Sequence, residues 1–218
     1  MTTTLVTGAN RGIGYELAKL LKARGHEVIA VCRKSSPELD RLGVRVESGI
    51  DVAKAAPELA KRVAGVELDL LIANAGVLHS DSLEELDFAQ VDEQLQVNAV
   101  GTLRTVHALL PQLRKGAKIA LITSRMGSIG DNGSGGYYGY RMSKAALNAA
   151  GVSLARDLKG RDISVAILHP GYVRTDMTGN QGGIAPSEAA GQLLERIDEL
   201  ELASSGTFWH ANGEILPW

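Results

Sequence analysis

A tyrosine and a lysine stand four residues apart in the second half of the chain, at Tyr140 and Lys144. Residues at this spacing share one face of an α-helix, so the phenol and the ammonium group are expected to lie together. A free phenol has a pKa near ~10, too high for easy proton exchange at neutral pH. An ammonium group about 4 Å away would favour the phenolate by about 4 kcal/mol at an effective dielectric constant of about 20. The spacing therefore predicts that Lys144 lowers the pKa of Tyr140 and makes it a general acid and base. Taken alone, such a pair is also common on a solvated helix surface.

Three glycines, Gly8, Gly12 and Gly14, lie between a short apolar run and a stretch of helical spacing. Glycine lets the backbone turn tightly and approach a phosphate, and the following helix N-terminus offers free N–H groups and a positive dipole end. The spacing is Gly-x-x-x-Gly-x-Gly, not the Gly-x-Gly-x-x-Gly fingerprint. A purely structural turn would explain isolated glycines equally well. Their position between the first strand and the first helix predicts a dinucleotide site.

The residues after the second apolar run favour NADP(H) over NAD(H) as the dinucleotide. A site that prefers NAD places a carboxylate here to hold the ribose 2′-hydroxyl, and this chain has none before Glu38. It has Arg33 and Lys34 instead, with Arg11 inside the glycine turn. Guanidinium groups suit a 2′-phosphate because they add charge and paired donors. The alternative is three solvated surface cations.

Apolar runs alternate with longer stretches of helical spacing, which predicts a doubly wound α/β fold. The expected strands are residues 4–7, 28–31, 44–47, 70–73, 118–123 and 164–168, with a weaker seventh at 207–209. Nearly all are apolar on both faces, as in a parallel sheet covered on both sides. The expected helices are residues 13–24, 55–64, 88–115, 137–159 and 186–200, with Gly25, Gly116 and Gly160 as helix-ending glycines. No linker or repeat interrupts the pattern, so residues 1–218 are expected to form a single domain.

Composition limits the possible partners. A chain of 218 residues, 44% of them hydrophobic, suits one domain with a full core. The net charge of -2 argues against nucleic acid and anionic membranes as partners. Cys32 is the only cysteine, which fits a reducing compartment, and His79, His107 and His210 show no metal-ligand spacing, so no metal is expected. Without a leader-like segment or an apolar run of ~20 residues, we expect a cytoplasmic protein that acts on small molecules.

The order of these motifs resembles the classical short-chain dehydrogenase/reductase family over nearly the whole chain. The segment from Thr7 to Gly14 is similar to its cofactor motif, and Tyr140-x-x-x-Lys144 to its signature. Further segments similar to the family are Asp51-Val52, Ala73-Asn74-Ala75-Gly76, Val-Asn98-Ala-Val-Gly, Ile-Thr-Ser124-Arg-Met-Gly and Pro170-Gly171-x-Val173-x-Thr175-Asp176. The amino-acid sequence around Ser124 and Tyr140 is most similar to that of the C-factor and sniffer-type carbonyl reductase subgroup.

The resemblance implies one Rossmann domain with a parallel sheet of about seven strands in the order 3-2-1-4-5-6-7. It implies an oxidoreductase that exchanges a hydride between NADP(H) and a carbonyl or alcohol. Tyr140 would be the proton donor, Lys144 its partner at the nicotinamide ribose, Ser124 a donor to the substrate oxygen, and Asn98 the holder of a helix kink and a relay water. The implied cofactor contacts are Gly8, Asn10, Arg11, Gly12, Ile13, Gly14, Arg33, Asp51, Val52, Asn74, Ala75, Gly76, Tyr140, Lys144, Pro170, Gly171, Val173 and Thr175.

Several alternatives stay open. The glycine-rich segment before Tyr140 is slightly longer than is usual in the family, so Ser128 is a second candidate for the active-site serine. Residues 178–185 carry few apolar side chains, which predicts an open pocket of broad selectivity or one completed by a neighbouring subunit. The long helices 88–115 and 137–159 resemble those through which the family forms homodimers and homotetramers. A non-enzymatic NADP(H)-binding sensor on the same fold is the main competing function, and an isomerase or epimerase is a third.

Overall fold

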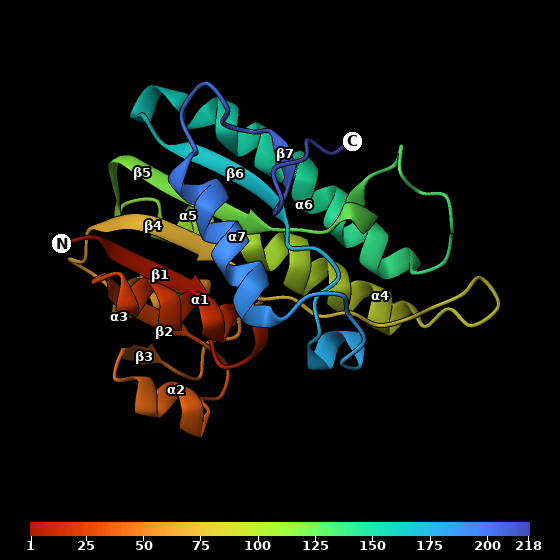
Figure 1. The fold of residues 1–218 in the computed structure, drawn as a ribbon, viewed down its shortest axis with the longest axis horizontal. Coiled ribbons are helices and arrows are strands. Elements are labelled where there is room, and N and C mark those ends of the chain that lie inside the picture. The colour runs from red at the N-terminus through yellow and green to blue at the C-terminus, as the bar shows by residue number, and fades with distance from the viewer.

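The computed structural model describes residues 1–218 and contains one sheet of seven parallel strands (Figure 1). The spatial order β3-β2-β1-β4-β5-β6-β7 confirms the expected order. The strands are β1 (Thr3–Thr7), β2 (Glu27–Val31), β3 (Arg45–Glu47), β4 (Leu68–Ala73), β5 (Leu113–Ile122), β6 (Ser164–His169) and β7 (Phe208–His210). The helices are α1 (Gly12–Ala23), α2 (Pro37–Leu42), α3 (Ala56–Arg62), α4 (Phe88–Gln94), α5 (Thr102–Leu109), α6 (Tyr138–Asp157) and α7 (Pro186–Asp198).

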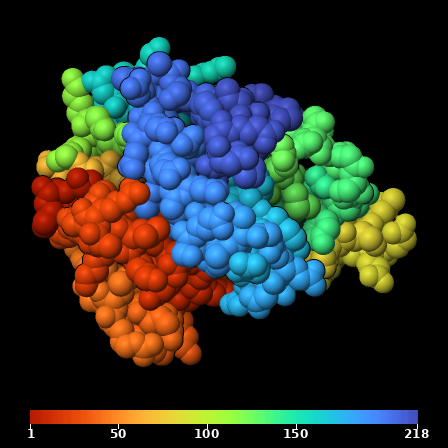
Figure 2. Space-filling view, in the orientation of Figure 1, coloured from red at the N-terminus to blue at the C-terminus, as the bar shows by residue number.

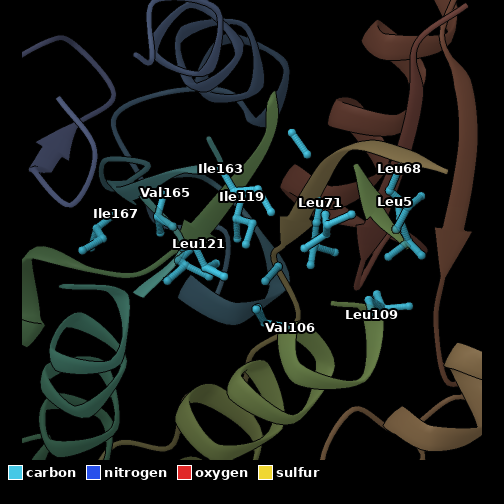
Figure 3. Close-up of a cluster of buried hydrophobic side chains, with 14 of the residues drawn as sticks. Leu5, Leu68, Leu71, Val106, Leu109, Ile119, Leu121, Ile163, Val165 and Ile167 are labelled. Atoms are coloured by element: carbon cyan, nitrogen blue, oxygen red, sulfur yellow. The ribbon is translucent and has the colours of Figure 1, made fainter. Parts of the chain in front are cut away.

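Helices cover both faces of the sheet, so the strands need apolar residues on both sides. Successive residues of a strand point to opposite faces. In β5, Ile119 and Leu121 therefore join one buried cluster, and Ala120 and Ile122 join the other. The first cluster packs against α3, α5 and α6, and Figure 3 shows its strand side chains above the helix that carries Val106 and Leu109. The second packs against α1 and α7, which contact each other along that face (Figure 1).

The chain reverses its direction of winding between β1 and β4. β1 pairs with β2 on one side and with β4 on the other. In an open parallel sheet, this switch point leaves a crevice outside the carboxyl ends of the strands, where ligands bind. The strands end there at Thr7, Ala73, Ile122 and His169, so the segments that follow these residues surround the crevice.

The helix expected at residues 88–115 is confirmed as far as Leu109, but its expected end is wrong. α4 passes into a π-helical segment, Leu95–Gly101, which continues into α5, and α5 ends at Leu109. β5 begins at Leu113, and Gly116 has a φ of +81° inside this strand. The pairing of β4 with β5 shifts register between Leu68 and Leu70, so the irregular start of β5 lacks the alternation that would have marked it as a strand.

Helix α2 was not expected from the sequence because six residues are too few to show helical periodicity. Its local signals are nevertheless present. The Ser36 side chain accepts a hydrogen bond from the Leu39 N–H, and Pro37 occupies the first turn. Gly43 ends the helix in the left-handed conformation. These are the usual start and stop residues of a helix.

The three glycines expected to end helices behave differently from one another. Gly25 does follow α1, with a φ of +82° and its N–H donating to the Lys22 carbonyl. Gly160 lies inside a short 3-10 turn after α6, and the left-handed residue there is Asp162, with a φ of +57°. Aspartate tolerates this conformation through local hydrogen bonding, so glycine was a misleading marker of this helix end. None of the helices is long and apolar enough to cross a lipid bilayer.

Candidate functional site

Two adjoining cavities open at the carboxyl ends of the strands. The glycine-turn cavity, of about 620 Å³, is lined by the Gly8–Gly14 turn and by the ends of β2 and β4. The tyrosine cavity, of about 590 Å³, is lined by Tyr140, Ser124 and the segment that follows β6. Ile13, Thr175 and Met177 line both, so the two cavities lie next to each other.

Close backbone packing explains two of the three glycines in the turn. Gly8 has a φ of +67°, and a Cβ there would lie 2.8 Å from the Ala75 Cα. A Cβ on Gly14 would lie 2.2 Å from the Gly8 carbonyl oxygen. The turn is also fastened to the end of β4, because the Thr7 hydroxyl accepts from the N–H groups of Asn74 and Ala75 at 3.0 and 3.1 Å. Glycine is thus required by the fold of the turn, independently of any ligand.

The N-terminus of α1 faces the glycine-turn cavity without any capping group. Arg11 occupies the N-cap position and makes no side-chain cap bond, and the first turn contains no acidic residue. Its unpaired N–H groups and the positive end of the helix dipole therefore suit an anion. These features of the α1 N-terminus fit a dinucleotide pyrophosphate, the group that the sequence predicts at this turn.

Cations line the far end of the same cavity. Arg33 and Lys34 both line it, and neither makes an ion pair. Arg11 is instead paired with Asp176 at 3.0 Å, on the segment after β6. Arg174, which the sequence did not single out, also lines the cavity. Two unpaired cations beside a nucleotide-sized space fit a 2′-phosphate.

The remaining expected cofactor residues are brought together as well. Those that line the glycine-turn cavity are Asn10, Gly12, Ile13, Asp51, Val52, Asn74, Ala75, Gly76 and Thr175. Those that line the tyrosine cavity are Ile13, Tyr140, Pro170, Gly171, Val173 and Thr175. The Asn74 amide donates to the carbonyls of Thr7 and Gly8 at 3.1 and 3.2 Å, so its side chain supports the turn.

Tyr140 projects from the first turns of α6 into the tyrosine cavity, with 7% of its surface exposed. Burial raises the pKa of Tyr140 to about 12, and the neighbouring Ser124 side chain acts weakly in the opposite direction. The expectation that Lys144 would lower this pKa is therefore wrong for the protein alone. Burial disfavours the charged form of the phenol more than the hydrogen bond with Ser124 favours it.

Lys144 lies one turn further along α6 and is almost completely enclosed, with 4% of its surface exposed. Its Nζ lies 5.6 Å from the centroid of the Tyr140 ring and donates to the Ile122 carbonyl at 3.0 Å. Burial lowers the pKa of Lys144 to about 8. It lines neither cavity, although a Cβ on Gly76 would lie 3.7 Å from its Nζ. Gly76 thus leaves room between the lysine and the glycine-turn cavity.

Of the two serine candidates, Ser124 shares the tyrosine cavity with Tyr140 and Ser128 does not. Ser124 lies just beyond the end of β5, after Thr123, and its Oγ accepts from the Met126 N–H at 3.2 Å. Ser128 is 2% exposed, and its Oγ accepts from the Asp131 N–H at 3.1 Å. The glycine-rich insertion lies after Ser124, so it does not displace this serine from Tyr140.

Asn98 lies in the middle of the π-helical segment and is fully buried. Its Oδ1 accepts from the Val77 N–H, and its Nδ2 donates to the Val77 carbonyl, both at 2.8 Å. Nδ2 also donates to the Ser143 hydroxyl at 2.9 Å. The amide is thus saturated by bonds that join the segment after β4 to α6, and it lines neither cavity.

His169, at the end of β6, lines the tyrosine cavity. Its ring meets the His210 ring edge-on, with the centroids 4.9 Å apart. Burial and the nearby His210 lower the pKa of His169 to about 3, so the ring is neutral at physiological pH. The segment after it folds back on itself, because the Arg174 N–H donates to the Ile184 carbonyl and the Gly183 N–H to the Tyr172 carbonyl.

Asp81 supports the start of α6, and no signal in the sequence pointed to it. Its carboxylate accepts from the N–H groups of Tyr138 and Gly139, and its carbonyl accepts from the Tyr137 N–H at 3.0 Å. Figure 2 shows its segment, in yellow, projecting at the edge of the molecule next to the green segment that leads into α6. A capping group 57 residues away along the chain can be recognised only in the folded structure.

Comparison with known proteins agrees with this geometry. The model of the family described as short chain dehydrogenase matches residues 2–183. The 1-hydroxy-2-glutathionyl-2-methyl-3-butene dehydrogenase of Rhodococcus sp. (strain AD45) is 42% identical over 226 aligned positions, covering 100% of both chains. The C-signal protein of Myxococcus xanthus is 42% identical over 154 positions, covering 69% of this chain and 93% of its own.

Solved structures show the same likeness. The carbonyl reductase Sniffer of D. melanogaster superposes with a TM-score of 0.93 at 31% identity, covering 100% of both chains. The NADPH-bound carbonyl reductase from chicken fatty liver superposes with a TM-score of 0.89 at 30% identity, covering 100% of this chain and 99% of its own. The chain therefore belongs to the short-chain dehydrogenase family of oxidoreductases, with sniffer-type carbonyl reductases among its structural neighbours.

Proposed function

We propose that this protein is an NADP(H)-dependent oxidoreductase that interconverts a carbonyl and an alcohol, with Tyr140 as general acid and base. The observation that carries the proposal is that the two cavities adjoin each other, with Ile13 and Thr175 in the lining of both. A substrate oxygen beside Tyr140 and Ser124 would thereby lie next to the inner end of the dinucleotide cavity.

The residues have distinct roles in this reaction. Tyr140, whose pKa is about 12, holds its proton at neutral pH and can give it to the carbonyl oxygen as negative charge develops there. The Ser124 hydroxyl would donate a second hydrogen bond to the same oxygen. Lys144, with a pKa of about 8, is mostly cationic at pH 7 and would stabilise the phenolate left on Tyr140. Asn98 would act as a positioning residue, because it fastens the segment after β4 to α6. The nicotinamide, when bound, supplies or accepts the hydride.

NADP(H) is the proposed cofactor. The glycine turn and the uncapped N-terminus of α1 would hold the pyrophosphate. Arg33 and Lys34 would hold the 2′-phosphate, since both line the cavity and lack a carboxylate partner. Lys144 would hold the nicotinamide ribose. The NADPH found in the chicken carbonyl reductase supports the same choice.

The decisive experiment follows NADPH oxidation against a panel of ketones, aldehydes, quinones and diketones, with NADH as the cofactor control. We expect the Tyr140→Phe variant to lose about 10²- to 10⁴-fold in kcat, the usual contribution of a general acid. It should still bind NADPH, measured by the change in nucleotide fluorescence. Equal turnover by the variant would contradict the role of Tyr140.

The panel also includes alcohols with NADP⁺, because the Rhodococcus relative is named as a dehydrogenase of a glutathionyl alcohol. A glutathione conjugate that bears a primary alcohol is therefore one member. Efficient oxidation of this alcohol, with slow reduction of simple carbonyls, would assign the oxidative direction to this protein.

A second candidate function is a non-enzymatic NADP(H)-binding sensor. The relative from Myxococcus xanthus, whose name denotes a signal, is the observation that favours it. A sensor would bind NADPH tightly without turning over any member of the panel, and Tyr140→Phe would leave its binding unchanged.

A further inference from the structure

Two arginines, Arg125 and Arg141, line the tyrosine cavity together with Tyr140 and Ser124. They differ in how their charges are balanced. The Arg125 guanidinium lies 2.6 Å from an Asp131 oxygen and 2.9 Å from a Glu214 oxygen. Two carboxylates thus neutralise Arg125 within the protein.

Arg141 has no carboxylate within 4.0 Å. Its Nε donates to the Gly136 carbonyl at 3.0 Å, and its Nη2 donates to the Ser134 hydroxyl at 2.9 Å and to the Gly135 carbonyl at 3.3 Å. Its Nη1 reaches only the Met126 carbonyl, at 3.5 Å. All of these acceptors are neutral, and a guanidinium has five N–H donors. Arg141 therefore keeps an unbalanced positive charge, and its Nη1 retains a donor hydrogen.

The other ionisable groups of the cavity do not offset this charge. Asp131 is the one acidic residue in its lining, and it is already paired with Arg125. His169 and Tyr140 are neutral at pH 7. Lys144 adds a further cation behind Tyr140. The cavity is therefore electropositive, and Arg141 is the lining group that an anion can reach without displacing a carboxylate.

We propose that the substrate carries a carboxylate and that Arg141 binds this carboxylate while the carbonyl lies at Tyr140. The inference rests on the proposed function and narrows its substrate class to oxo acids, formyl acids and the hydroxy acids they yield. Arg141 follows Tyr140 directly in α6, so a single helix turn would set the position of the carboxylate relative to the proton donor. Arginine suits this role because it forms paired, charge-assisted bonds with a carboxylate.

Arg141 also holds the loop at residues 134–136, so its loss could lower activity through the loop alone. Acid and ester pairs separate the two roles. We would measure kcat/KM with NADPH for 4-carboxybenzaldehyde and methyl 4-formylbenzoate, and for 5-oxohexanoate and its methyl ester. The ratio of acid to ester is independent of the fraction of folded protein, so a partly unfolded variant still gives a valid answer.

We expect the wild type to prefer each acid by about tenfold, the effect of one charge-assisted hydrogen bond at a partly exposed site. Arg141→Gln should bring the ratio close to one, and Arg141→Lys should keep part of the preference. Arg156→Gln removes the same charge from the exposed end of α6, outside both cavities, and should leave the ratio unchanged.

The possible results point to different conclusions. Equal losses for acid and ester in Arg141→Gln would overturn the inference and leave Arg141 as a loop support. A wild-type ratio near one would also overturn it while leaving the proposed function standing. NADPH binding without oxidation, with these four compounds and with the whole carbonyl panel, would instead count against the proposed function and would remove the inference with it.

Discussion

The side chains of Tyr140 and Lys144 are both enclosed by protein, with 7% and 4% of their surfaces exposed. Loss of water disfavours the charged form of each group. The pKa of Tyr140 therefore rises to about 12 and that of Lys144 falls to about 8. A phenol that keeps its proton suits donation to a carbonyl, and the lysine ammonium beside it would stabilise the phenolate that this donation leaves.

The lowered pKa of Lys144 predicts that this buried lysine decreases the free energy of unfolding of the wild type at neutral pH. Below pH 8 the lysine is charged in both states, and its burial costs about 3 kcal/mol relative to the unfolded chain, whose lysine titrates at 10.5. Between about pH 8 and pH 10.5 the unfolded chain binds the extra proton, so the cost disappears as pH rises. Lys144→Met should therefore raise the free energy of unfolding by up to about 3 kcal/mol at pH 7 and by much less at pH 10.

Urea unfolding of the cofactor-free protein at both pH values would measure this difference. Lys61→Met, at an exposed position of α3, is the control and should show no such change with pH. A Lys144→Met protein that is less stable than the wild type at pH 7 would contradict the argument.

Arg33 should control the choice between NADPH and NADH. It lines the glycine-turn cavity and has no acidic partner, whereas Arg11 is paired with Asp176. Arg33→Ala is expected to lower kcat/KM for NADPH by about tenfold or more, since it removes one charge-assisted contact, and to change the value for NADH little. Steady-state kinetics with both nucleotides would test this, with Arg11→Ala for comparison. A wild type that uses NADH as well as NADPH would contradict the cofactor assignment.

Helix α6 carries the proton donor, its neighbouring cation and the proposed carboxylate anchor, so the orientation of this helix sets the whole site. The first turn of α6 lacks a cap of its own, because the N-cap residue Tyr137 has a left-handed φ of +52° and makes no side-chain cap bond. Asp81 supplies the missing acceptors from the segment after β4. Asn98 joins the same segment to α6 through Val77 and Ser143. One connection after β4 therefore positions α6 at two places.

Asp81→Ala should cost about 1–2 kcal/mol of stability, which is the loss expected for a helix N-cap. It should also lower kcat, because the turn that leads to Tyr140 loses its acceptors. Asp87→Ala is the matched control, since Asp87 caps α4 through the N–H groups of Ala89 and Gln90, away from both cavities. Thermal unfolding and turnover would be measured on both variants. If the two variants lose stability and kcat equally, Asp81 is only a general stabiliser.

Across the whole molecule, the site lies where five strands end and where the winding of the sheet reverses (Figure 1). The catalytic candidates come from the segment after β5, the π-helical segment and α6, and the cofactor candidates from the loops after β1, β2, β4 and β6. Each of these loops follows a strand whose residues are mostly buried. The precision of the site therefore depends on the packing of both faces of the sheet.

The assembly of the protein remains a prediction at this scale. Phe88, Leu103 and Met142 expose apolar side chains on α4, α5 and α6, at 70%, 43% and 51%. We expect these helices to be covered in a homodimer or homotetramer, because exposed apolar surface favours association. Size-exclusion chromatography with light scattering should show the oligomer, and Leu103→Glu should shift it toward the monomer. A wild type that is monomeric at micromolar concentration would contradict the prediction.

Much of this protein can be predicted from the sequence alone. The strands were predictable because they are short runs that are apolar on both faces, as a sheet covered on both sides requires. The strand order followed from the resemblance to the short-chain dehydrogenase/reductase family. The glycine turn was predictable from the spacing of its glycines between the first strand and the first helix. The close contact at Gly14 is local, with the Gly8 carbonyl, whereas the contact of Gly8 with Ala75 appears only in the fold. The pairing of Tyr140 with Lys144 was equally local, because it depends only on the period of a helix.

Other features of the site were determined only by the tertiary structure. They depend on contacts between distant residues or on the removal of water from a side chain. The pKa of Tyr140 is raised because the side chain is buried, and the spacing of residues in the sequence does not indicate burial. Ser124 rather than Ser128 shares the cavity because the path of the loop, not its length, places each serine. Asp81 supports α6 across 58 residues of the chain, a contact that only the fold brings about. Turns, helix faces and strands depend on the spacing of residues along the chain, so the sequence determines them. Desolvation of side chains and contacts between distant residues arise only when the separate elements pack against one another.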